Sequence, residues 1–306
     1  MISVVVLAYN PEPQVMRLID EFYEQEDIEV IVANNGDPIS FPNGVKVLNL
    51  GKNRGVDALN EAYHVARGEV IATFDQDMFI KRDDMRTLVE PIQRGECLLV
   101  AATVVRVDSC YPETRWRRGV LGGFYGGAFA VGRQVIDAGV RFDAEFFLYV
   151  HELDFLCQVY DKFGLAAAKY STATTLRATR EVDLRGKRRR VDYFTLRNRI
   201  LFFRKHVRWT PKAVRNILVR SVVEACLRAL IFANIDVFWL ALRDGVTTRV
   251  STHHYSSHVI DAILTTPNST FSRGPLVAIW LDLLLPWMNH ATSKANRKRG
   301  KPWQNC

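Results

Sequence analysis

The sequence predicts an α/β fold with a mostly parallel central sheet flanked by helices, followed by a helical C-terminal extension. Three observations predict it. Over the first hundred residues, short β-branched runs alternate with longer segments whose apolar residues recur at helical spacing. Such alternation is typical of parallel strands joined by crossover helices. Polar residues follow four of the expected strands, and a long helical pattern lies in the C-terminal third.

The elements follow in order from the apolar pattern. Residues 2–7 form a continuous apolar run, as expected for a buried strand, and residues 13–25 carry apolar side chains at helical spacing. Further strands are expected at 28–33, 45–50, 70–74 and 98–107, and further helices at 55–67 and 82–94. In such sheets ligands bind beyond the carboxyl ends of the strands, so the residues after each strand are the place to look for chemistry.

Composition and charge describe an ordinary globular protein with an uneven surface. The chain has 306 residues, 48% of them hydrophobic and 24% charged, which excludes disordered, collagen-like and coiled-coil proteins. Residues 1–110 hold 10 basic and 18 acidic side chains, whereas residues 111–306 hold 31 and 15. We therefore expect one domain over 1–205, divided into halves at 110, and a helical, basic region over 206–306.

Cysteine usage and the N-terminus favour a cytoplasmic protein. The five cysteines are odd in number and widely scattered, so neither a disulfide framework nor a zinc site is expected. The chain starts directly with the apolar run at 2–8, without a preceding basic segment or a following cleavage site. This pattern is not that of a signal peptide.

Polar residues follow the first four expected strands. They lie at 8–11, 34–37, 52–55 and 75–77. Asn, Gly and Asp are common turn residues, so each cluster alone has a plain structural explanation. Four such clusters converging at one edge of a parallel sheet favour a ligand site instead.

Asp75 and Asp77 form an Asp-x-Asp motif directly after the apolar strand at 70–74. Mg²⁺ and Mn²⁺ prefer oxygen ligands and commonly share them with substrate phosphates. A cation held there could neutralise the charge that develops on a diphosphate leaving group. The alternative is a solvated turn, because the motif is common by chance.

These motifs, taken together and in order, resemble the family-2 inverting glycosyltransferases, which have the nucleotide-sugar-binding GT-A fold. The matching stretches are 4–11, 30–36, 49–55, 58–60, 68–77, 126–129 and 142–147. The resemblance covers about the first 205 residues, which would form the catalytic domain, with a nucleotide-sugar half over 1–110 and an acceptor half over 111–205. Asp75-Gln76-Asp77 and residues 193–199 look most like the rhamnosyltransferases of that family.

The resemblance implies donor and metal contacts. Asp75 and Asp77 would hold Mg²⁺ or Mn²⁺, with Asp75 also facing the ribose. The family usually has an aspartate where Asn34 stands, which leaves the preference for a nucleotide base open. The implied donor-binding residues are Ala8, Tyr9, Asn10, Asn34, Asn35, Asn53, Arg54, Asp57, Asp75 and Gln76.

The resemblance also points to a catalytic base in residues 149–155. An inverting transfer needs a carboxylate that takes the proton of the attacking hydroxyl, and Glu152 is the first candidate, with Asp154 the second. Stabilisation of a helix start is the structural alternative for both. His151 is expected to orient a carboxylate rather than to transfer protons.

Other residues are expected to meet the sugar and the acceptor. Gly126 and Gly127 would let the backbone approach the sugar closely, although a plain turn is the alternative, and Arg197 and His151 are grouped with them. The family often places a histidine where residues 174–179 lie, and none is present here. A metal site completed by such a histidine is therefore in doubt.

The C-terminal third is both basic and apolar. Residues 177–220 hold 15 basic and 3 acidic side chains; a run such as 185–190 is commonly a solvated loop, but one of this size suggests an anionic partner. A long helical pattern spans 213–242, interrupted by charges, and 276–288 is too short to cross a bilayer. With the basic tail at 294–301, the latter could lie in a lipid interface or pack on the protein or on a second copy as a homo-oligomer.

The sequence therefore predicts a metal-dependent inverting glycosyltransferase that moves rhamnose or a hexose from a dTDP or UDP sugar to an acceptor hydroxyl. A glycan or lipid-linked acceptor at the cytoplasmic face of the cell membrane fits the C-terminal region, and an anionic membrane surface is its expected partner. The alternatives are transfer to a soluble or nucleic-acid acceptor, and a non-catalytic nucleotide-sugar-binding protein. Proteins that bind single-stranded nucleic acid usually place exposed aromatic side chains among their basic residues. Residues 177–192 contain no aromatic side chain.

Overall fold

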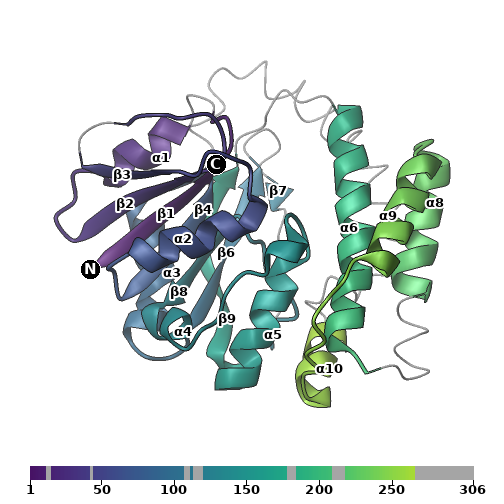
Figure 1. Cartoon of the computed structure of the whole chain (residues 1–306). Coiled ribbons are helices and arrows are strands. Elements are labelled where there is room, and N and C mark those ends of the chain that lie inside the picture. The colour runs from purple at the N-terminus through teal and green to yellow at the C-terminus, as the bar shows by residue number, and fades with distance from the viewer. Residues whose placement is uncertain are drawn as a thin grey trace.

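The structure, a computed structural model of the chain, describes residues 1–11, 15–41, 44–106, 111–112, 120–177, 184–208 and 218–265. A single twisted sheet occupies one part of the molecule, and a group of helices stands beside it (Figure 1). The order of the hydrogen-bonded strands along the sheet is β3-β2-β1-β4-β8-β6-β9-β5, with β7 paired to β6.

The first half of the sheet is parallel. β1 (Ile2–Ala8) lies between β2 (Ile28–Asn34) and β4 (Val70–Asp75), and β3 (Val45–Asn49) pairs with β2. Nearly every residue of β1 is buried, because helices cover both faces of a parallel sheet. The expected strands at 2–7, 28–33, 45–50 and 70–74 are thus confirmed.

The second half contains the reversed strands. β8 (Ala128–Gly132) runs antiparallel to both β4 and β6 (Leu99–Arg106), so β6 points the same way as β4. β9 (Ala168–Arg177) is parallel to β6, while two short strands, β5 (Met78–Ile80) and β7 (Tyr111–Pro112), are antiparallel to their partners. Most of the described strands therefore share one direction, which confirms the expected sheet.

Helices pack on both faces of the sheet. The buried side chains of α1 (Val15–Phe22) and α3 (Arg82–Gln93) belong to one apolar core. Those of α2 (Ala58–Val65), α4 (Arg133–Asp137) and α5 (His151–Phe163) belong to another on the opposite face. Short 3-10 turns, η1 (Gly55–Asp57), η2 (Ala144–Phe146) and η3 (Leu165–Ala167), connect them.

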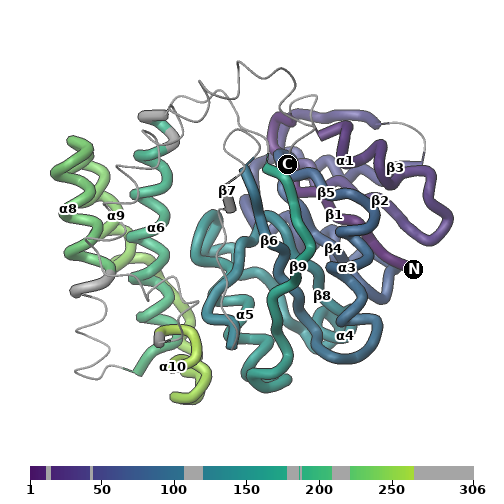
Figure 2. The backbone as a smooth tube through the Cα atoms, turned by 180° about the vertical axis from the view of Figure 1, so that it is seen from behind, coloured from purple at the N-terminus to yellow at the C-terminus, as the bar shows by residue number. Residues whose placement is uncertain are grey.

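The C-terminal helices stand beside α5, away from the N-terminal strands (Figure 2). α6 (Leu184–His206), the π-helical turn η4 (Leu218–Val223), α8 (Glu224–Ile231) and α9 (Ile235–Thr247) enclose a small apolar core of their own. α10 (Ser257–Thr265) and the end of α6 instead add side chains to the core under α5. None of the described helices combines the length and apolarity needed to cross a bilayer.

Two expectations for the C-terminal third need correction. The helical pattern expected to run through 213–242 is broken, because Ala233 adopts a left-handed backbone with φ of 53° between α8 and α9. The basic run at 185–190 is the first part of α6 rather than a loop. Residues 276–288 and 294–301, the expected interfacial segments, lie outside the described residues.

Candidate active site

The polar residues after β1, β2, β3 and β4 meet at one edge of the sheet, as predicted. The register pairs Ala8 with Asn34 and Leu7 with Asp75 on neighbouring strands. The chain continues in the same arrangement, because the amide of Asn35 donates to the carbonyl of Ala8 at 2.8 Å. The loops that carry the predicted donor contacts are therefore adjacent in space.

Gln76 fixes the loop after β1. Its side-chain carbonyl accepts from the amide of Tyr9 at 2.5 Å, and its side-chain amide donates to the carbonyl of Tyr9 at 3.1 Å. The Tyr9 side chain is left 48% exposed. Asn10, with a left-handed φ of 44°, lies against Gly36 of the next loop. Tyr9 is consequently held by its backbone while its ring is available to a ligand.

The side chains of Asn34 and Asn35 hydrogen-bond to residues at the end of β3 and in the loop that follows it. Both are buried. The Asn34 amide donates to Asn49 Oδ1 at 2.7 Å, and Asn35 Oδ1 accepts from the amide of Arg54 at 3.0 Å while its own amide donates to the carbonyl of Gly55 at 2.8 Å. These bonds tie the loops after β2 and β3 together, a structural role that the donor-binding prediction did not include.

The loop after β3 carries a compact ion cluster. Arg54 pairs with Asp57 at 2.5 Å and with Glu61 at 3.1 Å, and these carboxylates raise the pKa of its guanidinium. Asn53 Oδ1 accepts from the amide of Gly55 at 2.9 Å. Two acidic side chains therefore already neutralise the charge of Arg54, which was expected to lie near a donor diphosphate.

The Asp-x-Asp motif sits in the turn from β4 to β5. Asp75 is the last residue of β4, and its amide donates to the carbonyl of Gly127 at 2.9 Å. Asp77 accepts from Arg177 Nε, at the end of β9, at 3.1 Å. The guanidinium of Arg177 also lies 5.5 Å from the centre of the Tyr125 ring. Arg177 occupies the stretch in which a family histidine was sought, and sequence reasoning missed it.

Gly126 and Gly127 separate the two sets of predicted side chains. A Cβ built on Gly127 would lie 2.5 Å from Asp75 Oδ2, and one built on Gly126 would lie 2.8 Å from His151 Nε2 and 2.9 Å from Glu152 Oε1. A carboxylate from β4 and one from the start of α5 thus approach two consecutive residues of backbone. Only glycine leaves room for this approach.

The carboxylate oxygens of Asp75 and Asp77 are ligands that suit a hard divalent cation. Both are carboxylates, and Mg²⁺ in particular is often held by one or two carboxylates together with substrate phosphates and water. The described residues hold no group of three or more His, Cys, Asp or Glu side chains that could bind a metal on their own. The set therefore fits a metal whose coordination the substrate completes.

Glu152 and His151 open helix α5. They lie in contact, with 3.5 Å between His151 Nε2 and Glu152 Oε1, and their side chains are 11% and 18% exposed. Burial lowers the pKa of the His151 imidazole, although Glu152 and Asp154 oppose this shift. His151 Nδ1 is buried and has no hydrogen-bond partner among the described residues. A neutral imidazole beside Glu152 agrees with an orienting role.

Asp154 has different surroundings from Glu152. It is fully buried, and Oδ1 meets Lys205 Nζ at 2.9 Å and His206 Nε2 at 2.5 Å, while Oδ2 accepts from Gln158 at 2.8 Å. Burial alone would raise its pKa, but the bond from His206 and the charge of Lys205 outweigh burial and lower it. Asp154 joins α5 to the end of α6.

The loop that leads into Glu152 is strained and is held by α6. Phe147, Tyr149 and Val150 have φ of 45°, 61° and 67°, a region that side chains other than glycine rarely adopt. The buried amide of Asn198 donates to the carbonyls of Leu148 and Tyr149 at 2.7 and 2.9 Å. The preceding Arg197 donates to the carbonyl of Glu145 at 2.7 Å, so its contact is with this loop.

Charges of both signs surround Tyr149. Burial raises the pKa of its phenol; Arg190 and Arg177 oppose the rise, and Asp75 and Glu152 add to it. The charges of two arginines and two carboxylates thus all act on the Tyr149 phenol.

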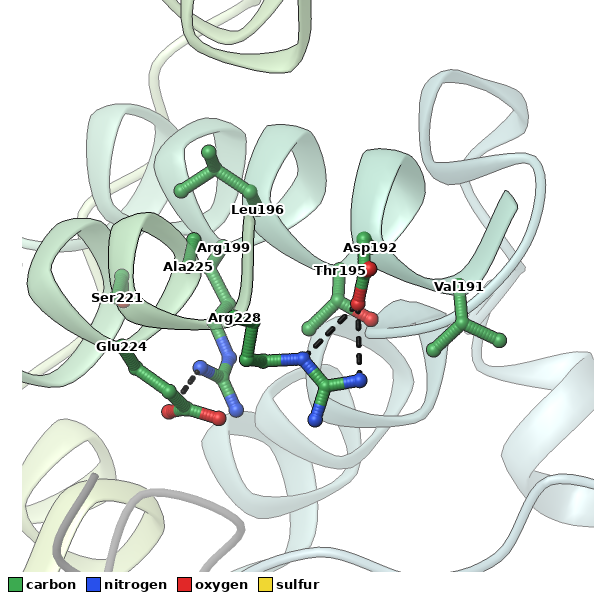
Figure 3. Close-up of a pocket in the computed structure, with 9 residues that line it drawn as sticks. All are labelled: Val191, Asp192, Thr195, Leu196, Arg199, Ser221, Glu224, Ala225 and Arg228. Carbon is green, nitrogen blue, oxygen red and sulfur yellow. Dashed lines mark hydrogen bonds and ion pairs between the residues drawn. The ribbon is translucent and has the colours of Figure 1, made fainter. Parts of the chain in front are cut away.

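A separate pocket lies within the C-terminal helices (Figure 3). Its volume is about 170 Å³, and α6, η4 and α8 line it. Arg199 pairs with Glu224 at 2.9 Å, and Arg228 pairs with Asp192 at 2.9 Å. The charged side chains that line this pocket are thus paired with one another, and none of them belongs to the predicted site.

Comparisons with known proteins agree with the fold. Residues 3–147, a little under half of the chain, match the model of a family described as Glycosyl transferase family 2. No curated protein matches the sequence. The mannosyltransferase PcManGT from Pyrobaculum calidifontis, solved with GDP-Man and Mn²⁺, is 17% identical with a TM-score of 0.55, covering 100% of this chain and 88% of that one.

Two other solved structures are more distant. Glucosyl-3-phosphoglycerate synthase from Mycobacterium tuberculosis, in complex with Mn²⁺, UDP-glucose and phosphoglyceric acid, is 19% identical over 64% of this chain and 77% of that chain, with a TM-score of 0.48. TarS 1–349 from S. aureus, in complex with UDP-GlcNAc, is 17% identical over 64% and 66%, with a TM-score of 0.45. The chain has the GT-A fold.

Proposed function

We propose that this chain is a metal-assisted inverting glycosyltransferase, which moves rhamnose or a hexose from a nucleoside diphosphate donor to an acceptor hydroxyl. The observation that carries the proposal is the close approach of Asp75 to Gly127 and of Glu152 to Gly126, two consecutive glycines. A donor diphosphate near Asp75 and an acceptor near Glu152 would then meet over backbone without side chains. The match of residues 3–147 to a glycosyltransferase family supports the same reaction class.

In the proposed reaction the acceptor oxygen attacks the anomeric carbon as the bond from that carbon to the diphosphate breaks. Glu152 takes the hydroxyl proton, and the electrons of the broken bond leave with the nucleoside diphosphate. His151, 3.5 Å from Glu152 Oε1, would keep that carboxylate directed at the acceptor. Transfer in one displacement inverts the configuration at the anomeric carbon.

The charge on the leaving diphosphate needs stabilisation. Mg²⁺ or Mn²⁺ bound by Asp75 and Asp77 would act there as a Lewis acid. Arg177 and Arg190, both close to Tyr149, would add fixed positive charge at the same edge. Such preorganised charge commonly supplies the largest part of catalysis in group transfer. Mn²⁺ in the structure of the mannosyltransferase from Pyrobaculum supports a divalent metal.

Binding of a donor is the first test. A panel of UDP, dTDP and GDP sugars should include at least one that raises the melting temperature when Mn²⁺ is present, and less so when it is chelated. A ligand at about 100 times its Kd stabilises the native state by about 2.7 kcal/mol. A panel without any metal-dependent shift would argue against the proposed donor class.

Glu152→Gln tests the base. We expect transfer to fall by about 10²–10⁴-fold, the usual contribution of a positioned general base, while the donor-induced rise in melting temperature stays unchanged. Asp161→Asn, an exposed carboxylate on the same helix, is the matched control. If Glu152→Gln transfers sugar at the wild-type rate, the base lies elsewhere.

The acceptor that we propose is a glycan or lipid-linked hydroxyl at the cytoplasmic face of the cell membrane. The basic first part of α6 supports an anionic acceptor or surface, because the same helix holds the loop that leads into Glu152 through Asn198. Radiolabelled donor incubated with a membrane lipid extract and with a polar extract would distinguish the two classes: the lipid-linked acceptor predicts label in the organic phase.

A further inference from the structure

The bend between α8 and α9 exposes apolar side chains that no described residue covers. Leu230 and Ile231 end α8, Ile235 begins α9 and Trp239 follows one turn later; they are 64%, 46%, 44% and 60% exposed. We call these four residues the hairpin patch. They lie within about two helical turns of Ala233, so they cluster at the bend. Large apolar patches on a soluble surface usually mark an interaction site.

Arginines surround the same bend. The guanidinium of Arg188 lies 3.9 Å from the centre of the Phe232 ring, and that of Arg228 lies 5.7 Å from it. Arg189 pairs with Asp236 at the start of α9. Arg188 and the exposed Arg190 are in no ion pair with the described side chains. The bend thus combines apolar side chains with excess positive charge.

The helices beneath the patch are held together. Arg199 of α6 pairs with Glu224 of α8, and Arg228 of α8 pairs with Asp192 of α6, on either side of the pocket in Figure 3. Phe238 and Ala241 of α9 are buried against Leu196 and Ile200 of α6. The hairpin patch is therefore the outer surface of a packed unit, so its exposure is a property of the fold.

We propose that the hairpin patch docks on the surface of an anionic phospholipid bilayer. Apolar side chains, including a tryptophan, would enter the interface while Arg188 and Arg190 contact lipid phosphates. A second copy of the chain fits less well, because a symmetric contact through this patch would bring two groups of arginines into one interface. Docking goes beyond sugar transfer and does not depend on it.

The patch lies on the same side of the molecule as the candidate active site. The first turns of α6 contact the bend through Arg188 and Arg189, and Asn198, further along the same helix, holds the loop that leads into Glu152. A bilayer bound at the bend would therefore lie close to the edge of the sheet where Glu152 stands. This arrangement would present a lipid-linked hydroxyl to the proposed base.

Sedimentation with vesicles tests the proposal on the full chain. We expect partitioning to equimolar phosphatidylglycerol and phosphatidylcholine to exceed partitioning to phosphatidylcholine alone by about tenfold or more, and to weaken as salt rises from about 0.1 M to about 0.5 M. Leu230→Ser with Trp239→Ser should lower partitioning to anionic vesicles by about tenfold or more. Phe163→Ser, which removes an aromatic side chain that is 36% exposed on α5, should leave it unchanged.

Three results would overturn the proposal: equal binding to the two vesicle types, unchanged binding of the double variant, or a lower melting temperature in that variant, which would mean that protein covers the patch. Dimerisation of the wild type that the double variant abolishes, without vesicle binding, would assign the patch to a second copy. Donor-induced thermal shifts should be the same in all these proteins, so a failure of docking is distinguishable from a failure of the proposed transferase.

Discussion

At the scale of single residues, Gly127 is the position where an added side chain would collide with Asp75. An added Cβ would lie 2.5 Å from Asp75 Oδ2 and 2.6 Å from Tyr125 Cε1, so Gly127→Ala must displace the carboxylate that we assign to the metal. Displacements of about 1 Å at a reacting group can cost about 10²-fold in rate, and we expect a loss of that order in kcat/KM.

Gly132→Ala is the control for this substitution. It lies at the other end of β8, and its nearest neighbour, Ile92 Cγ2, would be 3.3 Å from the new Cβ. Transfer assays and melting temperatures on both variants separate a local effect on the site from a general loss of stability. Wild-type kinetics in Gly127→Ala would mean that Asp75 is not positioned as we propose.

Arg177 is the second residue for which the structure makes a specific prediction. Its guanidinium pairs with Asp77 at 3.1 Å and would compete with a metal for that carboxylate. A unit charge a few ångströms from another contributes about 1 kcal/mol in a solvated site, so Arg177→Gln should lower the Mn²⁺ concentration needed for half-maximal donor binding by about fivefold.

Titration calorimetry with Mn²⁺ and nucleotide measures this effect. Arg177→Lys should stay close to wild type because it keeps the charge, and Lys169→Gln, on the same strand but paired with Glu96, should change nothing. Weaker Mn²⁺ binding in Arg177→Gln would show instead that Arg177 holds Asp77 in place for the metal.

At the scale of elements, the contact between α5 and α6 depends on one buried ion cluster. Asp154 meets Lys205 and His206 with no exposed surface of its own, and Lys205 also pairs with Asp143 at 2.6 Å. Removing one member of a buried pair typically costs about 3–5 kcal/mol. We expect Asp154→Asn to lower the free energy of unfolding by that amount.

The pH dependence of this loss follows from the two pKa shifts. The pKa of Asp154 lies below its usual 3.8, so its contribution to stability is present above that pH and disappears as pH falls through the lower folded value. The pKa of Lys205 lies above its usual 10.5, because its attraction to Asp154 and Asp143 outweighs the effect of burial. Its contribution disappears as pH rises through the higher value.

Urea unfolding of the wild type and of Asp154→Asn should therefore differ by a constant amount between about pH 5 and about pH 9 and converge in acid. Asp161→Asn, exposed on the same helix, should show no such difference. A difference that is already gone near neutrality would contradict the assigned ion cluster.

The sequence predicted the parallel strands and the polar loops that follow them. It missed the strands whose place in the sheet depends on pairing with residues far away in the chain. β1 to β4 have strong apolar runs, whereas β8 is short and β9 has the mixed sequence Ala168–Arg177, so their places become clear only when each pairs with β6. The break at Ala233 has no glycine or proline to announce it. Local pattern alone does not specify such features.

The residues of the candidate site also fall into two groups, those that local sequence patterns indicated and those that they did not. The Asp-x-Asp motif and the two glycines could be found from sequence because each is a local pattern after or before a strand. Arg177, Asn198 and Lys205 were missed, since each acts on a residue about fifty or more positions earlier in the chain. The one sequence signal for Arg177 is its position as a basic residue at the end of β9.

At the scale of the whole molecule, the C-terminal helices belong to two cores. Leu196 and Ile200 of α6 pack with α8 and α9, but Leu201, Phe202 and Phe203, one turn further, are buried in the core under the sheet. Side chains beyond residue 205 complete that core, namely Val207, Tyr255, Val259, Ile260, Ile263 and Leu264. The predicted domain boundary at 205 therefore passes through a region of continuous packing.

A chain that ends at residue 205 tests that boundary. It would lose six buried apolar side chains, each contributing about 1.5–3 kcal/mol, against a typical total stability of about 5–15 kcal/mol. We expect it not to unfold cooperatively.

Two point variants of the full chain make the same comparison. Ile263 is fully buried, so Ile263→Ala should lower the free energy of unfolding by about 2–5 kcal/mol. Ile235 is 44% exposed, so Ile235→Ala should lower it by under about 1 kcal/mol. Calorimetry on the three proteins provides the measurement, and a truncated chain that melts at the wild-type temperature would make residues 206–306 a separate unit. The expected loss instead means that α10 completes the core of α5, and α6, which contributes to both cores, joins this core to the helices that bear the hairpin patch, so the membrane-docking surface and the proposed base would move as one body.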